Sequence, residues 1–395
     1  MILAAGTLAQ SSFSALSVGL PALAPALRSD YHLSLGDTGV VLGAVGIGML
    51  FALLPWGLLA DRVGERVVMA SGLFGAGIAV ALAAETHTFW PLVGVLSAAG
   101  ALGSSVNAAS GRAVMGWFGA HERGLALGIR QTAIPIGGAA AAGGLPWLAD
   151  TGGTRLAFFV LGCSCVTGAL VAAAFMREAP ARTPELDDVT GPLRDARMWF
   201  LAGGSALYLT SQIAITGFVV LFLHVHRHVS TGASAAVLAG INVLGIGARI
   251  GAGRWSDRVG SRLAPLRLIG VALALATVAV AAVVDAPLAV LVPLLGVAGV
   301  LGLAWNGLSF AAAAETSGLA KSGAALGFQQ TILGVMVAVV PPAFAHVAGV
   351  SWRLAFALSA AGPVLGVLAL QRVPELASRR SVRSRGTSAI PPAAR

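Results

Sequence analysis

The sequence predicts an all-α membrane protein with twelve transmembrane helices, arranged as two pseudo-symmetric six-helix bundles. Three observations predict this fold: the composition, the length of the apolar segments and a set of motifs that recurs half-way along the chain. Of the 395 residues, 57% are hydrophobic and only 10% are charged, whereas a soluble domain has about 25% charged residues. The mean hydropathy of +0.86 agrees with this. We therefore expect the chain to fold in lipid.

Each predicted helix is an apolar segment long enough to cross a bilayer, which takes about 20 residues. Helices satisfy their own backbone hydrogen bonds in lipid, whereas barrel strands would alternate polar and apolar residues. The segments lie at 2–27, 38–60, 66–84, 90–113, 122–148, 155–176, 199–223, 233–255, 264–284, 287–313, 321–347 and 351–371.

The net charge of +9 could suggest a partner such as nucleic acid. The basic residues instead fall between apolar segments, so nucleic acid is excluded and the charge sets membrane topology. Basic residues concentrate on the cytoplasmic side of a membrane protein. With both termini in the cytoplasm, only Arg28, Arg155, Arg227 and Arg353 face outwards. We expect a multi-pass protein of the plasma membrane with this orientation.

Four short motifs recur in the same order at an offset of just under 200 residues. The pairs are Asp-Arg-Val-Gly at 61–64 and 257–260, Leu-Gly with a following Asn and Ser at 102–110 and 301–309, Leu-Gly with a following Gln-Thr at 127–132 and 326–331, and Arg-Leu-Ala-Phe at 155–158 and 353–356. An offset that spans six helices leaves the two halves parallel, related by an axis along the membrane normal.

The repeat and the polar segments between apolar runs predict four regions. They are an N-terminal six-helix bundle at 1–176, a cytoplasmic linker at 177–198, a C-terminal six-helix bundle at 199–372 and a basic, disordered cytoplasmic tail at 373–395. The linker is rich in proline and charge, which favours an irregular connection.

The segment Gly57–Arg66, with the sequence Gly-Leu-Leu-Ala-Asp-Arg-Val-Gly-Glu-Arg, resembles the signature loop between helices 2 and 3 of the major facilitator superfamily. The segment 253–262 is similar to the second-half copy of that loop. The pattern usually has a basic residue where Glu65 stands. Through topology and repeat the resemblance covers almost the whole chain, and it does not resolve a subfamily.

The resemblance implies two six-helix bundles around a central site that opens alternately to each side of the membrane. It also implies that helices 1, 4, 7 and 10 line the path. The polar residues agree with this layout, because the segments 2–27 and 199–223 are rich in Ser, Thr and Gln. The third and ninth segments each carry one hydroxyl residue, and the twelfth carries only Ser359 beyond its first residue. Polar groups are costly in hydrocarbon, so polar helices belong inside.

Arg130 lies well inside the fifth predicted helix, and an ionised group at that depth is expected to face the bundle interior or a cavity. It either binds an anionic group of a solute or pairs with a backbone carbonyl or a polar group of another helix. Arg249 in the eighth helix either contacts solute or extends towards the interface. The other substrate candidates, for which packing between helices is the alternative, are Gln10, Asn107, Gln131, Tyr208, Gln212, Trp305, Asn306 and Gln330.

The resemblance further implies a gate. In it, Asp61 reaches the start of helix 11, Asp257 reaches the start of helix 5, and these contacts latch the cytoplasmic side closed, with Arg112 as an ion partner. The alternative is that the charges only set topology. The remaining members of the predicted gate are Arg62, Gly64, Arg66, Arg258 and Gly260.

The sequence predicts neither a cofactor nor a metal site. His224, His226 and His228 alternate at the outer end of helix 7, but no neighbouring Cys or acidic residue completes a ligand set. No phosphate-binding Gly-x-x-x-x-Gly-Lys loop is present, which argues against ATP hydrolysis. No close catalytic cluster favours an enzyme.

These observations favour a monomeric secondary active transporter that works by alternating access on a small organic anion such as a carboxylate. Its partners would be the solute, the lipid bilayer and either a coupling proton or an exchanged solute. The alternatives are a drug or metabolite efflux permease of the same fold and a non-transporting membrane sensor.

Overall fold

The computed structural model describes residues 1–117, 123–177, 194–317 and 322–375. The described chain forms only helices and the turns between them. Within it, the backbone but not the side chain is described at 61, 112, 114–116, 123–128, 322 and 323. The predicted linker and tail fall largely outside the described ranges, so the four predicted region boundaries stay predictions.

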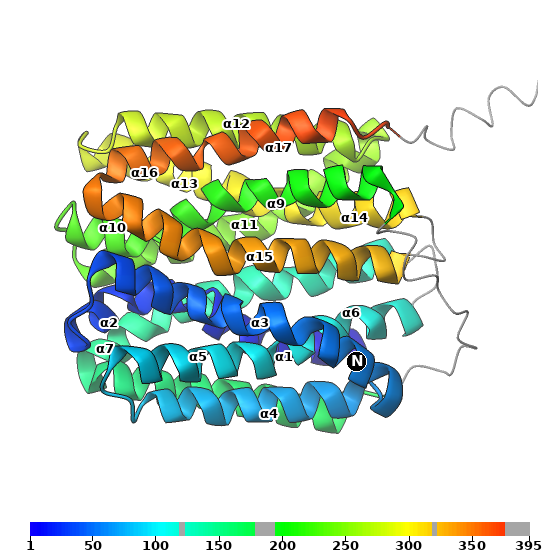
Figure 1. Cartoon of the computed structure of the whole chain (residues 1–395), viewed down its shortest axis with the longest axis horizontal. Coiled ribbons are helices and arrows are strands. Elements are labelled where there is room, and N and C mark those ends of the chain that lie inside the picture. The colour runs from blue at the N-terminus through cyan, green and yellow to red at the C-terminus, as the bar shows by residue number, and fades with distance from the viewer. Residues whose placement is uncertain (118–122, 178–193, 318–321, 376–395) are drawn as a thin grey trace, which may run out of the picture.

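The helices run side by side along the long axis of the molecule (Figure 1). The elements before residue 178 are α1 (Ile2–Ser17), η1 (Leu20–Leu23), α2 (Ala24–Asp30), α3 (Leu35–Val63), α4 (Glu65–Ala83), α5 (Phe89–Gly103), α6 (Ser105–Trp117) and α7 (Arg123–Phe175). Those after residue 193 are α9 (Ala196–Thr216), α10 (Val219–Val225), α11 (Thr231–Val259), α12 (Leu263–Ala282), α13 (Leu288–Ala304), α14 (Asn306–Ser317), α15 (Ser322–Val350), α16 (Trp352–Ser359) and α17 (Ala361–Gln371).

The described residues contain 11 helical stretches that are long and apolar enough to cross a membrane. One of them, Ile129–Phe175, has 47 residues, which is too long for a single crossing. Inside it, Gly152 and Gly153 depart from helical geometry, and Gly153 has a φ of 69° that favours glycine. This break divides the stretch into two spans, so the fold has the twelve spans that the sequence predicts.

Several spans that the sequence predicts as continuous helices are interrupted. The first span breaks between α1 and η1, the fourth at Ser104, the seventh at Gly217–Phe218 and the tenth at Trp305. The twelfth span is also interrupted, at Ala360. The first four are the spans that the resemblance places along the path. A broken helix leaves backbone groups without intrahelical partners in the middle of the membrane, where they can bind side chains or solutes.

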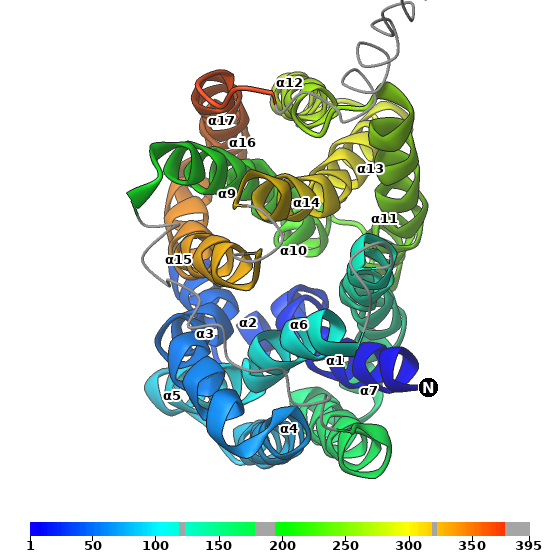
Figure 2. The same cartoon turned by 90° about the vertical axis from the view of Figure 1, so that its right-hand side faces the viewer.

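The two groups of helices, α1–α7 and α9–α17, meet along two antiparallel helix pairs, α3 with α15 and α7 with α11 (Figure 2). Small residues permit the first contact. A Cβ atom added to Gly39 would lie 2.3 Å from the Cβ atom of Ala345 and 2.7 Å from the carbonyl oxygen of Pro341. In the second pair, a Cβ atom on Gly138 would lie 2.7 Å from Oδ1 of Asn242.

We call the end of the molecule at which α3 finishes the Gly64 end and the end at which α16 begins the Trp352 end. The α3–α15 pair is tight near the Trp352 end and looser towards the Gly64 end. A Cβ atom on Gly334 would meet its nearest neighbour, Leu53, only at 3.8 Å, an ordinary contact distance. The two groups are therefore packed together most closely at the Trp352 end.

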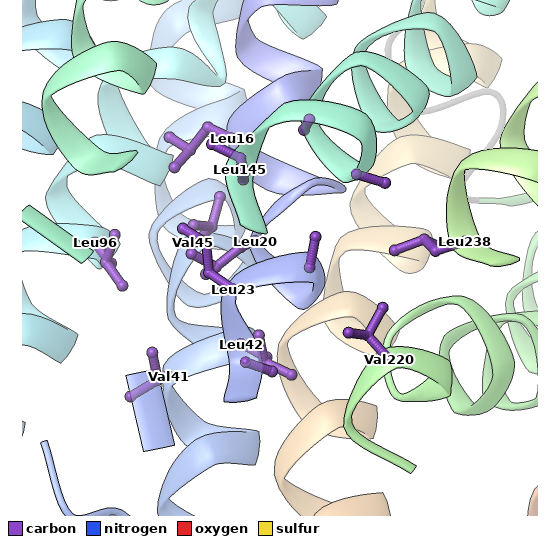
Figure 3. Close-up of a cluster of buried hydrophobic side chains, with 14 of the residues drawn as sticks. Leu16, Leu20, Leu23, Val41, Leu42, Val45, Leu96, Leu145, Val220 and Leu238 are labelled. Atoms are coloured by element: carbon purple, nitrogen blue, oxygen red, sulfur yellow. The ribbon is translucent and has the colours of Figure 1, made fainter. Parts of the chain in front are cut away.

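The hydrophobic core has the same asymmetry. One continuous cluster joins the two groups, with Leu20, Leu23 and Leu42 from the first and Val220 and Leu238 from the second (Figure 3). A second cluster, which reaches the Gly64 end around Met198 and Leu370, contains residues of the C-terminal group alone. Burial of apolar surface thus holds the groups together at the Trp352 end and does so less at the other.

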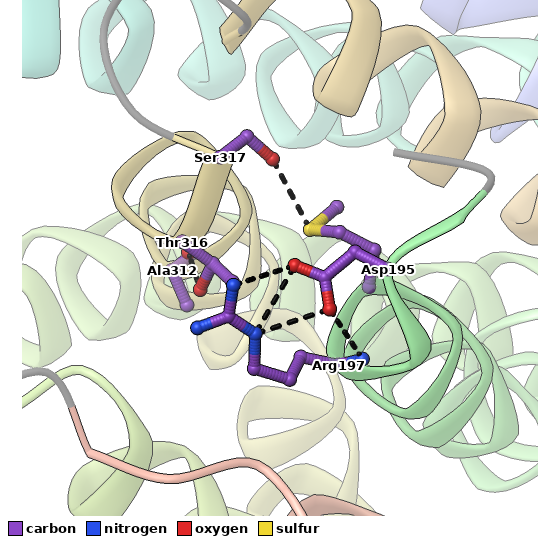
Figure 4. Close-up of polar contacts among 6 residues, drawn as sticks. Asp195, Arg197, Ala312, Thr316 and Ser317 are labelled. Atoms are coloured by element: carbon purple, nitrogen blue, oxygen red, sulfur yellow. Dashed lines mark hydrogen bonds and ion pairs between the residues drawn. The ribbon is translucent and has the colours of Figure 1, made fainter. Parts of the chain in front are cut away.

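At the Gly64 end, one polar contact links α14 to α9, next to an ion pair at the start of α9 (Figure 4). Asp195 caps the first turn of α9 and forms an ion pair of 2.7 Å with Arg197. The hydrogen bond from Arg197 lowers the pKa of the Asp195 carboxyl. The hydroxyl of Ser317, at the end of α14, donates to Sδ of Met198 at 3.3 Å. These contacts stay within the C-terminal group.

The seam between α3 and α15 predicts the effect of a single methyl group. We expect Gly39→Ala to lower the thermal midpoint of the purified protein by several degrees, because the added methyl overlaps the backbone of α15. Gly57→Ala in the same helix is the matched control, since a Cβ atom there meets nothing within 4 Å. Thermal unfolding followed by size-exclusion chromatography measures both, and equal midpoints for the two variants would contradict the assigned seam.

Candidate functional site

The guanidinium of Arg130 lies inside the N-terminal group, where its side chain is 6% exposed. Its Nε donates to Oγ of Ser110 at 2.8 Å, and its Nη2 donates to the carbonyl oxygen of Asn107 at 3.2 Å. Gln10 completes the cluster, because its Nε2 donates to Oδ1 of Asn107 at 2.8 Å. Helices α1, α6 and α7 therefore bring together three residues that the sequence predicts as substrate ligands.

A similar cluster stands at the repeat-related place in the C-terminal group. Nε2 of Gln329, the counterpart of Arg130, donates to the hydroxyl of Ser309, which bonds to the hydroxyl of Ser205 at 2.7 Å. The Oε1 atom of Gln329 is buried without a hydrogen-bond partner. The two halves thus build the same polar cluster, and only the first half carries a charge in it.

Ser110, Ser309 and Gln329 were not predicted as site residues, although all three lie at positions related by the repeat. The signal that would have found them is the pairing of repeat positions within each half: residue 110 with 130, and residue 309 with 329. Gln330, which was predicted, lies next to Gln329 on α15 and is half-buried.

Arg249 is 8% exposed and makes two short hydrogen bonds to backbone carbonyls. Its Nε donates to the oxygen of Leu303 at 2.8 Å, and its Nη1 donates to the oxygen of Gln131 at 2.7 Å. Leu303 belongs to the C-terminal group and Gln131 to the N-terminal group. Arg249 therefore does not extend to the membrane–water interface. It joins the two groups of helices where α7 meets α11.

The aromatic candidates pack inside the C-terminal group. Oε1 of Gln212 accepts from Nε1 of Trp305 at 3.1 Å and from Nδ2 of Asn306 at 3.3 Å. Trp305 is fully buried and meets the ring of Tyr208 edge to face, with ring centroids 5.6 Å apart. These contacts bring together the four candidates of the seventh and tenth spans.

Tyr208 points away from the N-terminal group, contrary to its predicted role as a substrate residue. Its hydroxyl donates to the carbonyl of Leu266 at 3.2 Å. Its ring fills the space beside Gly270 and Gly366, which belong to α12 and α17. Tyr208 lies four residues before Gln212 and shares a helix face with it, but glycines of α12 and α17 leave room for its ring away from the N-terminal group.

The repeated loops contain glycines for a conformational reason. Gly64 and Gly260 end α3 and α11 with φ angles of 88° and 71°, which side chains rarely adopt. In the second loop, Nη1 of Arg262 lies 2.5 Å from Oδ1 of Asp257, and its Nε lies 2.9 Å from Oε1 of Glu315. The loop carboxylate is thus held by an arginine of its own loop.

For the other predicted gate residues whose side chains are described, the structure gives exposure but no contacts across the two groups. The side chains of Arg62, Arg66 and Arg258 are exposed at the Gly64 end. The side chains of Asp61 and Arg112 lie outside the described residues, so their partners stay predictions.

At the Trp352 end, ion pairs explain one of the sequence repeats. Nη2 of Arg155 lies 2.7 Å from Oε1 of Glu85, and Nη2 of Arg353 lies 3.0 Å from Oδ2 of Asp285. His226 binds the other oxygen of Asp285 at 3.0 Å, and the bonds from His226 and Arg353 lower the pKa of that carboxyl. Among the described residues, no three His, Cys, Asp or Glu side chains gather as metal ligands would.

A cavity of about 250 Å³ opens between the two groups at this same end. Its polar wall consists of Ser29, Asp30 and Asp150 from the N-terminal group and His224 and Thr231 from the C-terminal group. Asp30 also binds Thr154, whose hydroxyl donates to it at 2.8 Å. The seam between the groups therefore ends in a shallow acidic vestibule.

Comparison with known proteins agrees with this arrangement. The sequence profile of the Major Facilitator Superfamily matches residues 5–341. An uncharacterized MFS-type transporter of Mycobacterium tuberculosis (strain CDC 1551 / Oshkosh) is 34% identical over 372 residues, which cover 93% of this chain and 83% of that protein. The crystal structure of a D-xylose-proton symporter superposes with a TM-score of 0.76 at 16% identity, and the match covers 96% of this chain and 98% of that one.

Two more distant relatives have names that state a solute class. Multidrug resistance protein MdtG of Salmonella typhi is 27% identical over 277 residues, which cover 67% of this chain and 66% of that protein. A probable L-galactonate transporter of Escherichia coli (strain K12) is 29% identical over 111 residues, which cover 28% of this chain and 24% of that protein. The profile match, the long alignment with a transporter and the twelve-span fold together show that this multi-pass membrane chain belongs to the Major Facilitator Superfamily.

Proposed function

We propose that the protein is a secondary active transporter that carries a small organic anion, such as a carboxylate, by alternating access. The observation that supports this most is the buried guanidinium of Arg130. Its two hydrogen bonds go to a hydroxyl and a backbone carbonyl, both neutral acceptors. No carboxylate pairs with it among the described residues, although a charge at this depth is costly.

An anionic solute would supply the missing counter-charge. A guanidinium has five N–H donors and binds a carboxylate through two of them, so Arg130 keeps donors available beyond its two protein contacts. The amides of Gln10 and Asn107 lie within the same hydrogen-bonded cluster and would bind further polar atoms of the solute. L-galactonate, which the name of one relative mentions, is a carboxylate with several hydroxyl groups.

The packing of the seams supports an alternating gate. In the present structure the two groups are closed against each other at the Trp352 end. If the register set by the contact of Gly39 with Ala345 continues along α3 and α15, Asp61 would face the first turn of α15. If the register set by the contacts of Gln131 with Arg249 and of Gly138 with Asn242 continues along α7 and α11, Asp257 would face the first turn of α7.

Each loop carboxylate would then face the N-terminus of a helix in the other group, which favours a negative charge. Such contacts would form when the Gly64 end closes and the Trp352 end opens. In this proposal the Gly64 end is cytoplasmic, which is the side that the basic loop residues favour. The carrier acts as a monomer, with a proton or an exchanged solute as its coupling partner.

The proposal predicts a loss of anion affinity when the buried charge is removed. We expect Arg130→Gln to raise the KM for a transported carboxylate by about ten- to a hundredfold, since a hydrogen bond between charged groups contributes about 1.5–3 kcal/mol. Counterflow into proteoliposomes, with a panel of carboxylates and of cationic drugs and with and without a pH gradient, measures this. Arg155→Gln removes the same charge from an exposed ion pair and is the matched control.

Three results would contradict the anion proposal. One is an unchanged KM for every transported carboxylate in Arg130→Gln. Another is an equal loss in Arg155→Gln. The third is transport of the cationic drugs alone, which would favour the efflux permease suggested by the multidrug relative.

The gate predicts an effect on rate without an effect on insertion. We expect Asp61→Asn to slow counterflow several-fold, because a neutral amide loses the attraction of about 0.3–1 kcal/mol or more between a carboxylate and a helix N-terminus. The amount of protein in the membrane should stay unchanged. Asp195→Asn is the control, because asparagine caps a helix as well as aspartate does. Equal rates for Asp61→Asn and the wild type would rule out the latch.

A further inference from the structure

The guanidinium of Arg249 forms hydrogen bonds with both groups of helices. Nε is held by the Leu303 carbonyl within the C-terminal group, and Nη1 reaches the Gln131 carbonyl in the N-terminal group. The bonds of the other buried polar clusters behave differently, because those of Arg130 and Gln329 each stay within one group. Arg249 is therefore placed to act on the relation between the groups.

The acceptor in the N-terminal group is an unusual carbonyl. In a regular helix the oxygen of residue 131 would accept from the backbone N–H of residue 135. Residue 135 is a proline inside α7, and proline has no N–H. The Gln131 carbonyl thus lacks its normal intrahelical donor, and the Arg249 guanidinium supplies one at 2.7 Å.

The acceptor in the C-terminal group has a similar origin. Helix α13 ends at Ala304, next to the break at Trp305, so the Leu303 carbonyl belongs to its last turn. The last four carbonyls of a helix have no intrahelical donor. One buried guanidinium therefore satisfies two backbone oxygens that helix irregularities leave without partners, one in each group.

We propose that Arg249 is a positioning residue that clasps the two groups together, through the carbonyl that Pro135 leaves free, and so stabilises the arrangement of the groups seen in this structure over arrangements in which that contact is broken. This role deepens the proposed function and rests on it, because a clasp matters only in a carrier whose halves separate. Charge-assisted hydrogen bonds are stronger than neutral ones, so the clasp contributes more to the seam than neutral hydrogen bonds to the same carbonyls would. In this proposal Arg249 binds backbone carbonyls and does not bind the solute.

The test follows the Trp352 end in the absence of any solute. Spin labels on His87→Cys and Val350→Cys, in a chain with Cys163→Ala and Cys165→Ala, place one probe on each group at exposed sites. Pulsed electron spin resonance in nanodiscs then gives the ratio of closed to open molecules. We expect Arg249→Gln and Arg249→Lys each to lower that ratio about tenfold, because lysine keeps the charge but cannot reach two carbonyls at once.

A second variant tests the carbonyl without changing Arg249. Pro135→Ala restores an N–H at residue 135, which would bind the Gln131 carbonyl within the helix and weaken the clasp. We expect a fall in the closed-to-open ratio in the same direction as for Arg249→Gln but smaller. Pro146→Ala, a proline of the same helix whose freed carbonyl Arg249 does not contact, should leave the ratio unchanged. Gln131→Ala should also leave it unchanged, since it keeps the carbonyl.

Several outcomes would overturn the clasp. An unchanged ratio in both Arg249 variants would do so, as would a shift in Gln131→Ala as large as that in Arg249→Gln. A Pro135→Ala ratio equal to that of the wild type would remove the role given to the free carbonyl. None of these measurements needs a transported solute, so a failure of the organic-anion proposal leaves this test intact.

Discussion

The structure depends on one constraint, which is that every polar group buried in lipid must find a partner inside the protein. Regular helices meet this constraint by themselves, and they make up most of the chain. The exceptions in the described residues are the breaks in the first, fourth, seventh, tenth and twelfth spans, the break at Gly152–Gly153, and the prolines inside α3, α7, α13 and α15. At these places backbone oxygens and amides lose their local partners. Buried arginines and amides collect around them for that reason.

A second requirement, that the two groups can move apart, explains why glycines line the seams of the proposed carrier. Helices that separate and meet again, as the proposed carrier requires, cannot depend on interlocked large side chains. Gly39 instead lies close to the backbone of α15, and Gly138 lies close to the side chain of Asn242. Polar side chains then fix where the helices meet. Asn242 beside Gly138 and Arg249 beside Gln131 lie seven residues apart on α11 and face residues seven apart on α7. This spacing keeps one face of each helix in register along the seam.

The sequence predicted the twelve spans and the repeat because both depend on composition and length, which a bilayer constrains strongly. It also named Arg130, Asn107 and Gln10 among the substrate candidates, but it did not predict that they form one hydrogen-bonded cluster. It did not predict the helix breaks, because a Gly-Ser pair or a Trp-Asn pair continues a helix in some contexts and ends it in others. The outward packing of Tyr208 depends on Gly270 and Gly366, which are distant in the chain. The partner of Arg249 is a backbone atom, and side-chain patterns carry no direct signal for it.

The sequence repeat helps to interpret the polar clusters around Arg130 and Gln329. Two halves with one repeated pattern place a serine and a long polar side chain together in each bundle, as Ser110 with Arg130 and as Ser309 with Gln329. If packing alone decided these positions, a neutral amide would serve in both, because it fills similar space without the cost of burying a charge. The charge stands in one half only, where it is bound by neutral acceptors. In the proposed carrier, an asymmetric charge in a symmetric frame would orient a solute that is itself charged at one end. The uncharged half would then move past that solute without having to separate an ion pair.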